Sequence, residues 1–164
     1  MQKIRKANAG DSPAIAAIYR YYVEETAISF ELTAPREEEM ARRIAAVQEK
    51  YPYLVLEEQG EVLGYAYASR YRDRAAYDRT AEISVYLRRD AQGQGRGKAL
   101  LAALLQQLKE QGIMTVVAVI TSGNQPSLDF FLSQGFQYAG TLENVGFKNG
   151  AWHGISQCTL PLGF

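Results

Sequence analysis

The sequence predicts one mixed α/β (α+β) domain in which helices and strands are interleaved along the whole chain. Two observations indicate this class. Apolar residues recur at helical spacing in several segments, and from Tyr53 onward other segments show the two-residue period of strands. In addition, no internal repeat, low-complexity tract or interdomain linker divides the 164 residues. A chain of this length can bury a sizeable core without a disulfide or a structural metal, so residues 1–164 are expected to form a single domain.

The first fifty residues indicate a short strand followed by two helices. In the first helix apolar residues recur at helical spacing, Pro13 suits the first turn, and either Asp11 or Ser12 can cap the start. After a linker at 27–35, residues 35–50 are expected to form the second helix, whose first turn carries acids that complement the helix dipole.

The remaining segments alternate between extended and helical patterns. The continuous apolar run at 114–120 predicts a strand that is buried on both faces. The other expected elements are a hairpin over 53–71 with a Gln59–Gly60 turn, a strand at 80–87, a helix at 97–111 stopped by Gly112, a short helix at 126–134 stopped by Gly135, and two closing strands at 136–147 and 151–162.

Composition limits the partners and the compartment. Eighteen basic and eighteen acidic residues leave no net charge, so neither nucleic acid nor an anionic membrane is expected as a partner. The single Cys158 cannot form an internal disulfide, and the N-terminal stretch lacks the apolar core of a signal peptide. The longest apolar run, residues 116–120, is far too short to span a bilayer. We therefore expect a soluble, cytoplasmic protein.

A glycine-rich loop stands between the strand at 80–87 and the helix that follows it. Gly93, Gly95 and Gly97 occupy alternate positions, and a strand, such a loop and a helix start together form a site where backbone N–H groups converge on a phosphate. The alternative is that these glycines only relieve tight packing. A nucleotide-hydrolase phosphate loop is excluded, because Gln92 and Ala99 stand where it needs glycine and Ser or Thr. The dinucleotide-binding fingerprint also fails, since its third glycine arrives one residue early.

The pattern that fits is Q-x-x-G-x-G at residues 92–97, followed by Lys98. It resembles the acetyl-CoA pyrophosphate loop of the GNAT superfamily of N-acetyltransferases, and "TSGNQPSLDFFLSQGF" at 121–136 resembles that family's N-x-x-(A/S)…G-F segment. Four stretches are similar to the phosphinothricin and methionine sulfoximine N-acetyltransferases: "YYVEETAISFELTAP", "YDRTAEISVYL", "VVAVITSGNQPS" and "GFKNGAWHGISQ". The resemblance covers roughly residues 3–162.

The resemblance implies a GNAT fold: a mixed, mostly antiparallel twisted sheet flanked by helices, whose central strands at 80–87 and 114–120 splay apart. The pantetheine arm of acetyl-CoA would lie in the opening, and the loop would hold the pyrophosphate. Arg96 and Lys98 can add charge there, or either can be a solvated side chain. The cofactor-binding residues implied are Val85, Tyr86, Leu87, Gln92, Gly93, Gln94, Gly95, Arg96, Gly97, Lys98 and Asn124.

Acyl transfer to an amine needs a base, because an amine with a pKa of roughly 8 to 10 is mostly protonated near neutral pH. Glu82 lies in an apolar strand just before the residues that would pair with the cofactor. The alternation of apolar and polar residues along this strand, taken alone, favours a Glu82 that faces solvent or pairs with Arg79 or Arg72. The resemblance instead implies that Glu82 is the general base, directly or through a water. A backbone N–H of Val85 or Tyr86, where the strand bulges, would polarise the thioester carbonyl.

Phe131 departs from the family pattern. Many members carry a tyrosine at the matching position, and the phosphinothricin branch often a histidine, which can protonate the departing thiolate. A thiol with a pKa near 8.5 lies about 1.5 units above neutrality, worth roughly 2 kcal/mol, so it can leave without a dedicated acid. Water or a tyrosine such as Tyr138 would supply the proton.

The branch implies a small amino acid with a tetrahedral, oxygen-rich side-chain group as the acceptor. An arginine suits such a group or the α-carboxylate, and Arg72 matches the branch's substrate arginine by position. The alternatives are a solvated loop for the four arginines of residues 69–80 and a core position for Phe30. The implied substrate-binding residues are Phe30, Arg72, Asp73, Arg74, Glu82, Ile83 and Ser84.

Lys148, Trp152 and His153 fall in a segment that, in the branch, lies near the dimer interface and the acceptor pocket. For His153 we expect a hydrogen-bonded structural role rather than metal binding, because no second ligand cluster accompanies it. Cys158 is expected to be a small buried apolar residue. No metal is expected, and a homodimer is implied by the branch.

The function predicted is therefore acetyl transfer from acetyl-CoA to the amino group of a small amino acid, of the phosphinothricin, methionine sulfoximine or methionine sulfone type. Two alternatives stay open. The acceptor can be another amine, such as a protein N-terminus, a polyamine or an aminoglycoside. The chain can also be an acyl-CoA-binding module without catalysis, which the loss of an acidic group at Phe131 makes conceivable.

Overall fold

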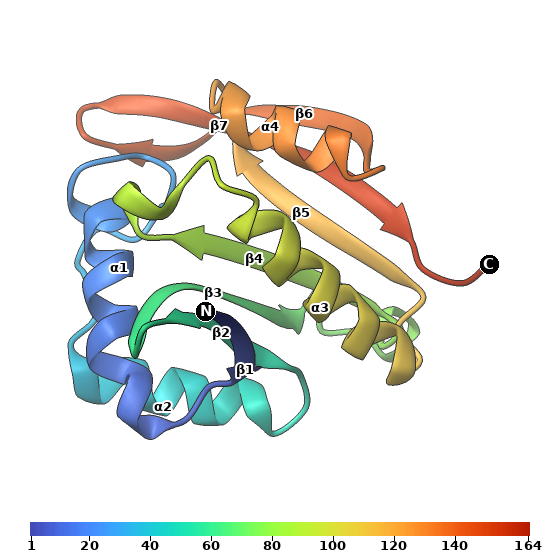
Figure 1. Ribbon diagram of the computed structural model, residues 1–164. Coiled ribbons are helices and arrows are strands. Elements are labelled where there is room, and N and C mark those ends of the chain that lie inside the picture. Colours follow the sequence, from blue (N-terminus) through green and yellow to red (C-terminus); the bar gives the residue numbers. More distant parts are fainter.

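The computed structural model describes residues 1–164 and contains one seven-stranded sheet with four helices (Figure 1). The strands are β1 (Gln2–Lys6), β2 (Tyr53–Glu58), β3 (Glu61–Arg70), β4 (Thr80–Leu87), β5 (Thr115–Thr121), β6 (Gln137–Lys148) and β7 (Ala151–Pro161). The helices are α1 (Ser12–Glu24), α2 (Glu37–Gln48), α3 (Arg96–Glu110) and α4 (Gln125–Ser133). Every element expected from the sequence periodicity is present, within a few residues at each end.

The sheet is mixed and mostly antiparallel, with the strand order β1-β2-β3-β4-β5-β7-β6. Only β4 and β5 run parallel, and their pairing covers four rungs, from Thr80↔Thr115 to Ile83↔Ala118. Beyond that rung the two strands continue without pairing to each other, β4 to Leu87 beside β3 and β5 to Thr121 beside β7. The predicted separation of the two central strands is therefore confirmed.

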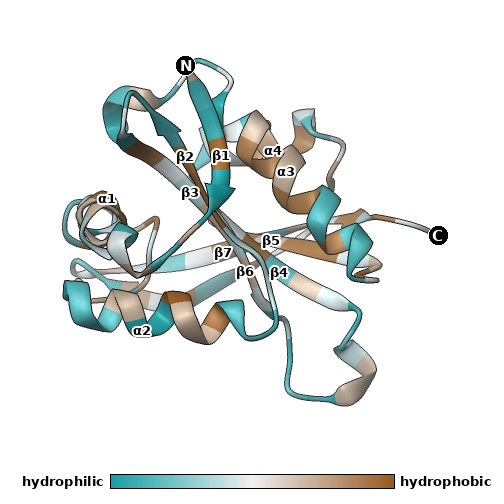
Figure 2. Ribbon diagram, turned by 60° about the horizontal axis from the view of Figure 1, so that its bottom comes forward, coloured by the Kyte–Doolittle hydropathy of each residue, from teal (hydrophilic) through white to brown (hydrophobic).

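Helices cover both faces of the sheet, α1 and α2 on one side and α3 and α4 on the other (Figures 1 and 2). Alternate residues of a strand pack into the hydrophobic layers on the two sides of the sheet, because successive side chains point to opposite faces. Leu54 and Leu56 pack in a cluster of 20 buried residues beneath α3, whereas Tyr53 and Val55 join a separate cluster of 12 beneath α1 and α2.

Strand β5 corrects one sequence expectation. Its even-numbered residues, such as Val116 and Ile120, are buried beneath α3 and α4. On the opposite face α1 and α2 reach only β2 to β4, and Val119 remains 36% exposed. The prediction that this strand is buried on both faces is therefore wrong at Val119.

Local chemistry explains the turn at residues 59–60 and the start of α1. Gln59 and Gly60 both have positive φ, 51° and 81°, which is the backbone that a two-residue hairpin requires. Asp11 stands at the N-cap position of α1, but its carboxylate makes no capping bond to the helix. It accepts hydrogen bonds from the Arg5 guanidinium and from Asn8 N–H, all at 2.8 Å. The Arg5 guanidinium holds the pKa of the Asp11 carboxyl below its usual value.

The β6–β7 hairpin forms one edge of the sheet and is irregular. The pairing register shifts between Tyr138 and Gly140 and again between Leu142 and Gly146, which are bulges in β6. No helix in the fold combines the length and the apolar character needed to cross a bilayer.

Tyr51 offers a test of the core. Its side chain is 8% exposed within the larger cluster, and its hydroxyl is the one buried side-chain polar atom without a hydrogen-bond partner. An unsatisfied buried hydroxyl is destabilising, so Tyr51→Phe is expected to raise the free energy of unfolding by about 1 kcal/mol in chemical denaturation.

The matched control is Tyr19→Phe, which removes a hydroxyl bonded to Ser29 Oγ at 2.6 Å and to the Glu31 carboxylate. The same chemical change should there lower the free energy of unfolding by about 1 to 2 kcal/mol. A loss of stability in Tyr51→Phe would contradict the assignment of an unpartnered hydroxyl.

Candidate active site

The opening between β4 and β5 exposes backbone groups whose direction follows from two hydrogen bonds. Arg88 N–H donates to the Leu63 carbonyl at 2.8 Å, so even-numbered residues of β4 turn their backbone groups toward β3. On the other side Met114 N–H donates to the Arg79 carbonyl at 2.8 Å, so odd-numbered residues turn theirs toward β5.

Val85 and Leu87 consequently direct their N–H and C=O groups into the opening, where β5 no longer pairs with β4. Tyr86 directs its groups to β3 instead. The β3–β4 register runs unbroken from Gly64↔Leu87 to Arg70↔Ala81, so the bulge expected at this point is absent. Of the two N–H groups predicted to polarise a carbonyl, only that of Val85 faces the opening.

A cavity of about 1090 Å³ follows this free edge of β4. Many of the residues predicted to bind the cofactor line it, namely Val85, Tyr86, Leu87, Gln92, Gly93, Gly97 and Asn124. The wall does not include Gln94 and Gly95 of the loop, nor Arg96 and Lys98 in the first turn of α3. Sequence reasoning missed the lining residues Tyr21, Tyr22, Ile28, Arg89, Asp90, Pro126, Ser127 and Phe130. Pro126, Ser127 and Phe130 lie within six positions of Asn124, so their closeness to that residue in the chain was the available signal.

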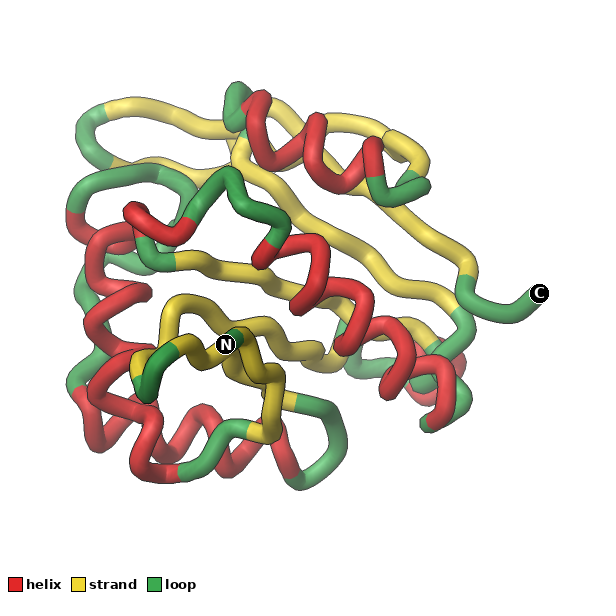
Figure 3. The backbone as a smooth tube through the Cα atoms, in the orientation of Figure 1, coloured by secondary structure: helices red, strands yellow, loops and turns green.

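The glycine loop links the end of β4 to the start of α3 (Figure 3). Gly93 and Gly95 have φ values of 81° and 78°, and a Cβ added at either would touch nothing within 4 Å. Backbone conformation therefore requires these two glycines, and relief of tight packing does not. Gly95 is the N-cap of α3, and the first bond back to it comes from Ala99 N–H at 3.1 Å. The N–H groups of residues 96–98 are thus free to bind an anion.

The two cations of the loop differ. The Arg96 guanidinium donates to both carboxylate oxygens of Glu58, at 3.0 and 2.9 Å, and to the Ala91 carbonyl at 3.0 Å. It is therefore neither solvated nor free to contact a phosphate, which corrects both alternatives considered from the sequence. The pairing also lowers the pKa of the Glu58 carboxyl. Lys98 is exposed and takes part in no salt bridge.

Helix α1 contributes a tyrosine that the sequence did not point to. The Tyr22 hydroxyl donates to the Leu87 carbonyl and accepts a hydrogen bond from Gln92 Nε2 at 3.0 Å. Burial raises the pKa of the Tyr22 hydroxyl, so it stays protonated at neutral pH.

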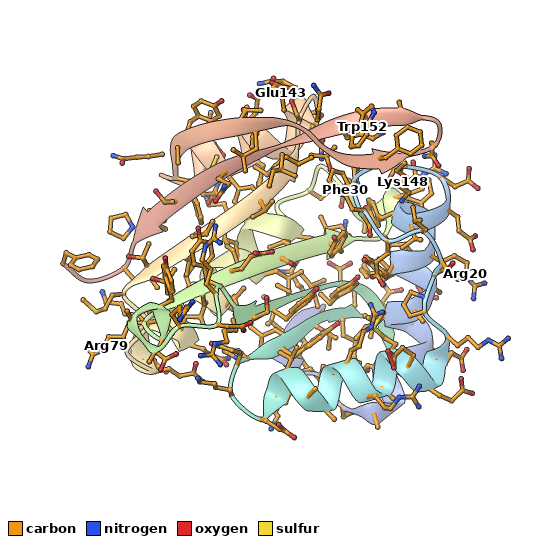
Figure 4. All side chains as sticks on the ribbon, turned by 180° about the vertical axis from the view of Figure 1, so that it is seen from behind. Arg20, Phe30, Arg79, Glu143, Lys148 and Trp152 are labelled. Carbon is orange, nitrogen blue, oxygen red and sulfur yellow. The ribbon has the colours of Figure 1, made fainter.

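Glu82 lies on the third of the four β4–β5 rungs, opposite Val117 on β5 and opposite Ser69 on β3. It is partly buried and makes no salt bridge or hydrogen bond, so the alternative of a pair with Arg79 or Arg72 does not hold, and its carboxylate is only partly exposed to solvent. Arg79 points outward at the end of the sheet (Figure 4). Burial raises the pKa of the Glu82 carboxyl above its ordinary value of 4.5.

Residues 83 and 84 face opposite sides of β4. The Ile83 side chain lies in the larger core cluster, so only its backbone can reach a ligand, and Ile83 is not a substrate-contacting side chain. Ser84 is partly exposed and shares the face of Glu82, opposite Tyr67 on β3.

Phe131 lines the cavity and is buried, with its ring 5.1 Å from both the Phe130 and the Phe136 rings. Tyr138 is 54% exposed on β6, bonds to the Thr141 hydroxyl and does not line the cavity. The suggestion that Tyr138 supplies a proton is therefore wrong.

The residues predicted to bind the acceptor fall into two groups. Arg72, Asp73 and Arg74 are exposed in the connection from β3 to β4, and the Arg72 guanidinium lies 5.1 Å from the Tyr71 ring centre without an ion pair. Phe30 lies near the opposite end of the sheet from Arg79, where this connection ends (Figure 4). The structure thus does not bring Phe30 and the arginine connection together.

Phe30 packs instead against the β6–β7 hairpin. A Cβ at Gly146 would fall 2.4 Å from the Phe30 ring, and the His153 ring lies 6.2 Å away. Lys148 is buried and donates to the Ser29 carbonyl at 2.6 Å, and burial lowers the pKa of its amine. His153 Nε2 lies 3.0 Å from the Lys148 carbonyl, in the hydrogen-bonded structural role expected for it.

Two further expectations concern metal and cysteine. The fold contains no group of three or more His, Cys, Asp or Glu side chains that could hold a metal ion. Cys158 is fully buried between β5 and β6, where burial raises the pKa of its thiol. It is the small buried apolar residue that the sequence predicted.

Comparison with known proteins gives the family. Residues 4–154 match the acetyltransferase (GNAT) domain. The chain is 44% identical over 151 residues to a phosphinothricin N-acetyltransferase of Alcaligenes faecalis, covering 91% of this chain and 77% of the relative. It is 39% identical over 161 residues to an L-methionine sulfoximine/L-methionine sulfone acetyltransferase of Pseudomonas paraeruginosa, covering 97% of this chain and 94% of the relative.

A solved structure agrees with these relatives. The phosphinothricin acetyltransferase of Sinorhizobium meliloti, crystallised in complex with acetyl-CoA, superposes with a TM-score of 0.94 at 38% identity, over 99% of this chain and 89% of that one. The resemblance stated from the sequence is confirmed, and with it the fold class. The chain belongs to the GNAT family of acetyltransferases, enzymes whose co-substrate is acetyl-CoA.

Proposed function

We propose that this protein transfers the acetyl group of acetyl-CoA to the amino group of a small amino acid, with Glu82 as the general base. The relatives named for phosphinothricin and for methionine sulfoximine or sulfone support this acceptor class. The observation that carries the proposal is the position of Glu82. An unpaired, partly buried carboxylate lies within one rung of the point where β4 and β5 separate.

Acetyl-CoA fits the opening and the cavity. The pantetheine arm would replace β5 as the neighbour of β4, pairing with the backbone groups of Val85 and Leu87. The diphosphate would lie on the free N–H groups at the start of α3. The acetyl carbonyl would then lie near Val85 N–H, which stabilises the oxyanion that forms during attack.

The acceptor's ammonium must lose two protons, one before attack and one as the amide forms, and the departing thiolate takes up one. Glu82 takes a proton from the acceptor's ammonium, directly or through a water, and the neutral amine attacks the thioester carbon. The C–N bond forms, the attached nitrogen gives its second proton to water as the tetrahedral oxyanion collapses, and the C–S bond breaks to release the thiolate of CoA. Phe131 cannot protonate this thiolate, which leaves as such and takes its proton from water.

The acceptor's acidic groups need a cation. Arg72 is exposed without an ionic partner in the connection that leads into β4, so its planar guanidinium is available for a carboxylate or a tetrahedral oxyanion. Asp73 and Arg74 flank it, and Ser84 shares the strand face of Glu82. A cationic acceptor such as a polyamine would be repelled by this cluster of arginines.

We propose that two copies associate through an apolar strip on the β6–β7 hairpin, made of Leu142, Val145, Phe147 and Trp152. Each of these side chains is at least half exposed, and the Phe147 and Trp152 rings pack edge to face 5.3 Å apart. Trp152 projects from the hairpin (Figure 4). Exposed aromatic side chains gathered on one edge are typical of an interface between proteins.

Glu82→Gln tests the base. With acetyl-CoA, wild type is expected to release free thiol with a small anionic amino acid from a panel of amines. The variant should lose about a hundredfold or more in kcat/KM, because it cannot accept the proton. Since burial raises the pKa of Glu82, wild-type kcat/KM should fall as the pH drops toward that pKa, above 4.5, and the variant should lack this acidic limb.

Stability separates this effect from damage to the fold. A carboxyl whose pKa is raised on folding destabilises the native state when it is ionised, above that pKa. Glu82→Gln should therefore be more stable than wild type at neutral pH, and the difference should vanish in acid. A variant as active as wild type at neutral pH would refute the assignment of Glu82.

Arg72→Ala tests the acceptor contact. Loss of a charge-assisted pair of hydrogen bonds should raise the KM for the anionic acceptor about tenfold or more, and leave the KM for acetyl-CoA unchanged. Arg20→Ala is the control, because Arg20 is exposed on α1 and makes no salt bridge. Equal acceptor KM values for the two variants would exclude Arg72 from the acceptor site.

Trp152→Glu tests the dimer. Sedimentation of wild type should give twice the mass of the 18.3 kDa chain, and the variant should sediment as a monomer because a carboxylate is costly to bury in an apolar interface. Phe164→Glu changes an exposed aromatic residue at the C-terminus and should remain dimeric. A monomeric wild type would overturn this association.

A further inference from the structure

Three residues from separate parts of the chain form a short hydrogen-bonded chain inside the cavity. Tyr22 comes from α1, Leu87 ends β4, and Gln92 begins the glycine loop. The Tyr22 hydroxyl donates to the Leu87 carbonyl and accepts from Gln92 Nε2 at 3.0 Å. All three residues line the cavity.

Packing does not explain the hydroxyl. The Tyr22 ring lies 5.1 Å from the Tyr21 ring and 5.2 Å from the Tyr86 ring, and a phenylalanine would make the same contacts. What the hydroxyl adds is a partner for one carbonyl of β4 and one amide of the loop. The carbonyl it bonds belongs to an odd-numbered residue, which faces the opening where β5 no longer pairs.

The remaining bonding capacity of these groups suits a ligand. A carbonyl oxygen has two lone pairs, so Leu87 can accept from Tyr22 and from one further N–H. Acetyl-CoA carries amide N–H groups in its pantetheine arm and phosphates in its nucleotide half. Leu87 lies where the arm would pass, and Gln92 lies where the phosphates would begin.

Acid catalysis is a poorer role for Tyr22. Its proton is already shared with the Leu87 carbonyl, and burial makes the phenol a weaker acid than a free tyrosine. Leu87 is also the last residue of β4, four positions beyond the final rung shared with β5. The hydroxyl is therefore placed to position groups, and not to protonate a thiolate.

We propose that Tyr22 and Gln92 are positioning residues: their two hydrogen bonds hold the Leu87 carbonyl for an amide of the pantetheine arm and couple it to the phosphate loop. The nucleotide and pantetheine halves of acetyl-CoA then reinforce each other's binding. This inference rests on the proposed binding of acetyl-CoA along β4.

The test compares CoA with its nucleotide half, 3′-phospho-ADP, by calorimetric titration of wild type and Tyr22→Phe. Loss of the hydroxyl should lower the affinity for CoA about tenfold, the size of one or two lost hydrogen bonds. The affinity for 3′-phospho-ADP should stay within about threefold of wild type. With saturating acetyl-CoA, kcat should stay within about twofold of wild type while the KM for acetyl-CoA rises. A merely structural role would not produce this selectivity.

Gln92→Ala provides a second route, since Gln92 is exposed on a loop and its loss should not affect folding. It should also weaken CoA more than 3′-phospho-ADP. The double variant should bind CoA as tightly as Tyr22→Phe alone does, because both substitutions break the same chain of hydrogen bonds. Tyr138→Phe removes a tyrosine hydroxyl bonded on β6 outside the cavity and should bind both ligands as wild type does.

Three results would overturn the inference: unchanged CoA affinity in folded Tyr22→Phe, an equal loss for CoA and 3′-phospho-ADP, or additive losses in the double variant. Failure of wild type to bind CoA is a different outcome, because it would overturn the proposed function itself.

Discussion

The architecture of the site depends on one constraint: two neighbouring parallel strands stop pairing halfway along their length. Buried backbone N–H and C=O groups need partners, and the end of β4 loses those that β5 supplied. The structure meets this need in part with the Tyr22 hydroxyl at Leu87 and leaves the Val85 groups facing the cavity. A ligand with amide groups spaced along an extended arm can satisfy what remains.

Partial burial gives Glu82 its chemical character. A carboxylate on the outside of the sheet would titrate near its ordinary pKa and would be screened by water, whereas a fully buried one would stay protonated. On the last rung but one before the separation, Glu82 is partly desolvated and has no cation beside it. Its affinity for a proton is therefore raised while the opening still allows an amine or a water to approach.

Short-range sequence patterns predicted the features that depend mainly on neighbouring residues. Periodicity located the helices and strands, the Gln59–Gly60 pair located a hairpin, and the spacing of Gly93 and Gly95 located a loop that needs positive φ. The resemblance to a known family predicted the separated strands and suggested the role proposed for Glu82, neither of which follows from a pattern within those segments.

Contacts between distant segments could not be predicted. Tyr22 and Gln92 lie 70 positions apart, and Arg96 and Glu58 lie 38 apart, so nothing near either residue indicates its partner. The bulge expected near Val85 failed for a related reason, because the register of β3 against β4 depends on the whole ladder. The exposure of Val119 depends on how far α1 and α2 extend over the sheet, which the composition of β5 does not encode.

The loop before α3 has a consequence for how such a sequence can change over generations. The anion contacts proposed for it come from main-chain N–H groups, which every residue except proline possesses, while the φ angles at residues 93 and 95 require glycine. Gln94 and Lys98 do not line the cavity, so their side chains can be replaced without changing its wall. Gln92 and Arg96 are more constrained. The Gln92 amide donates to the Tyr22 hydroxyl on α1, and the Arg96 guanidinium donates to Glu58 on β2. Tolerance to mutation should therefore differ between neighbouring positions of this short segment.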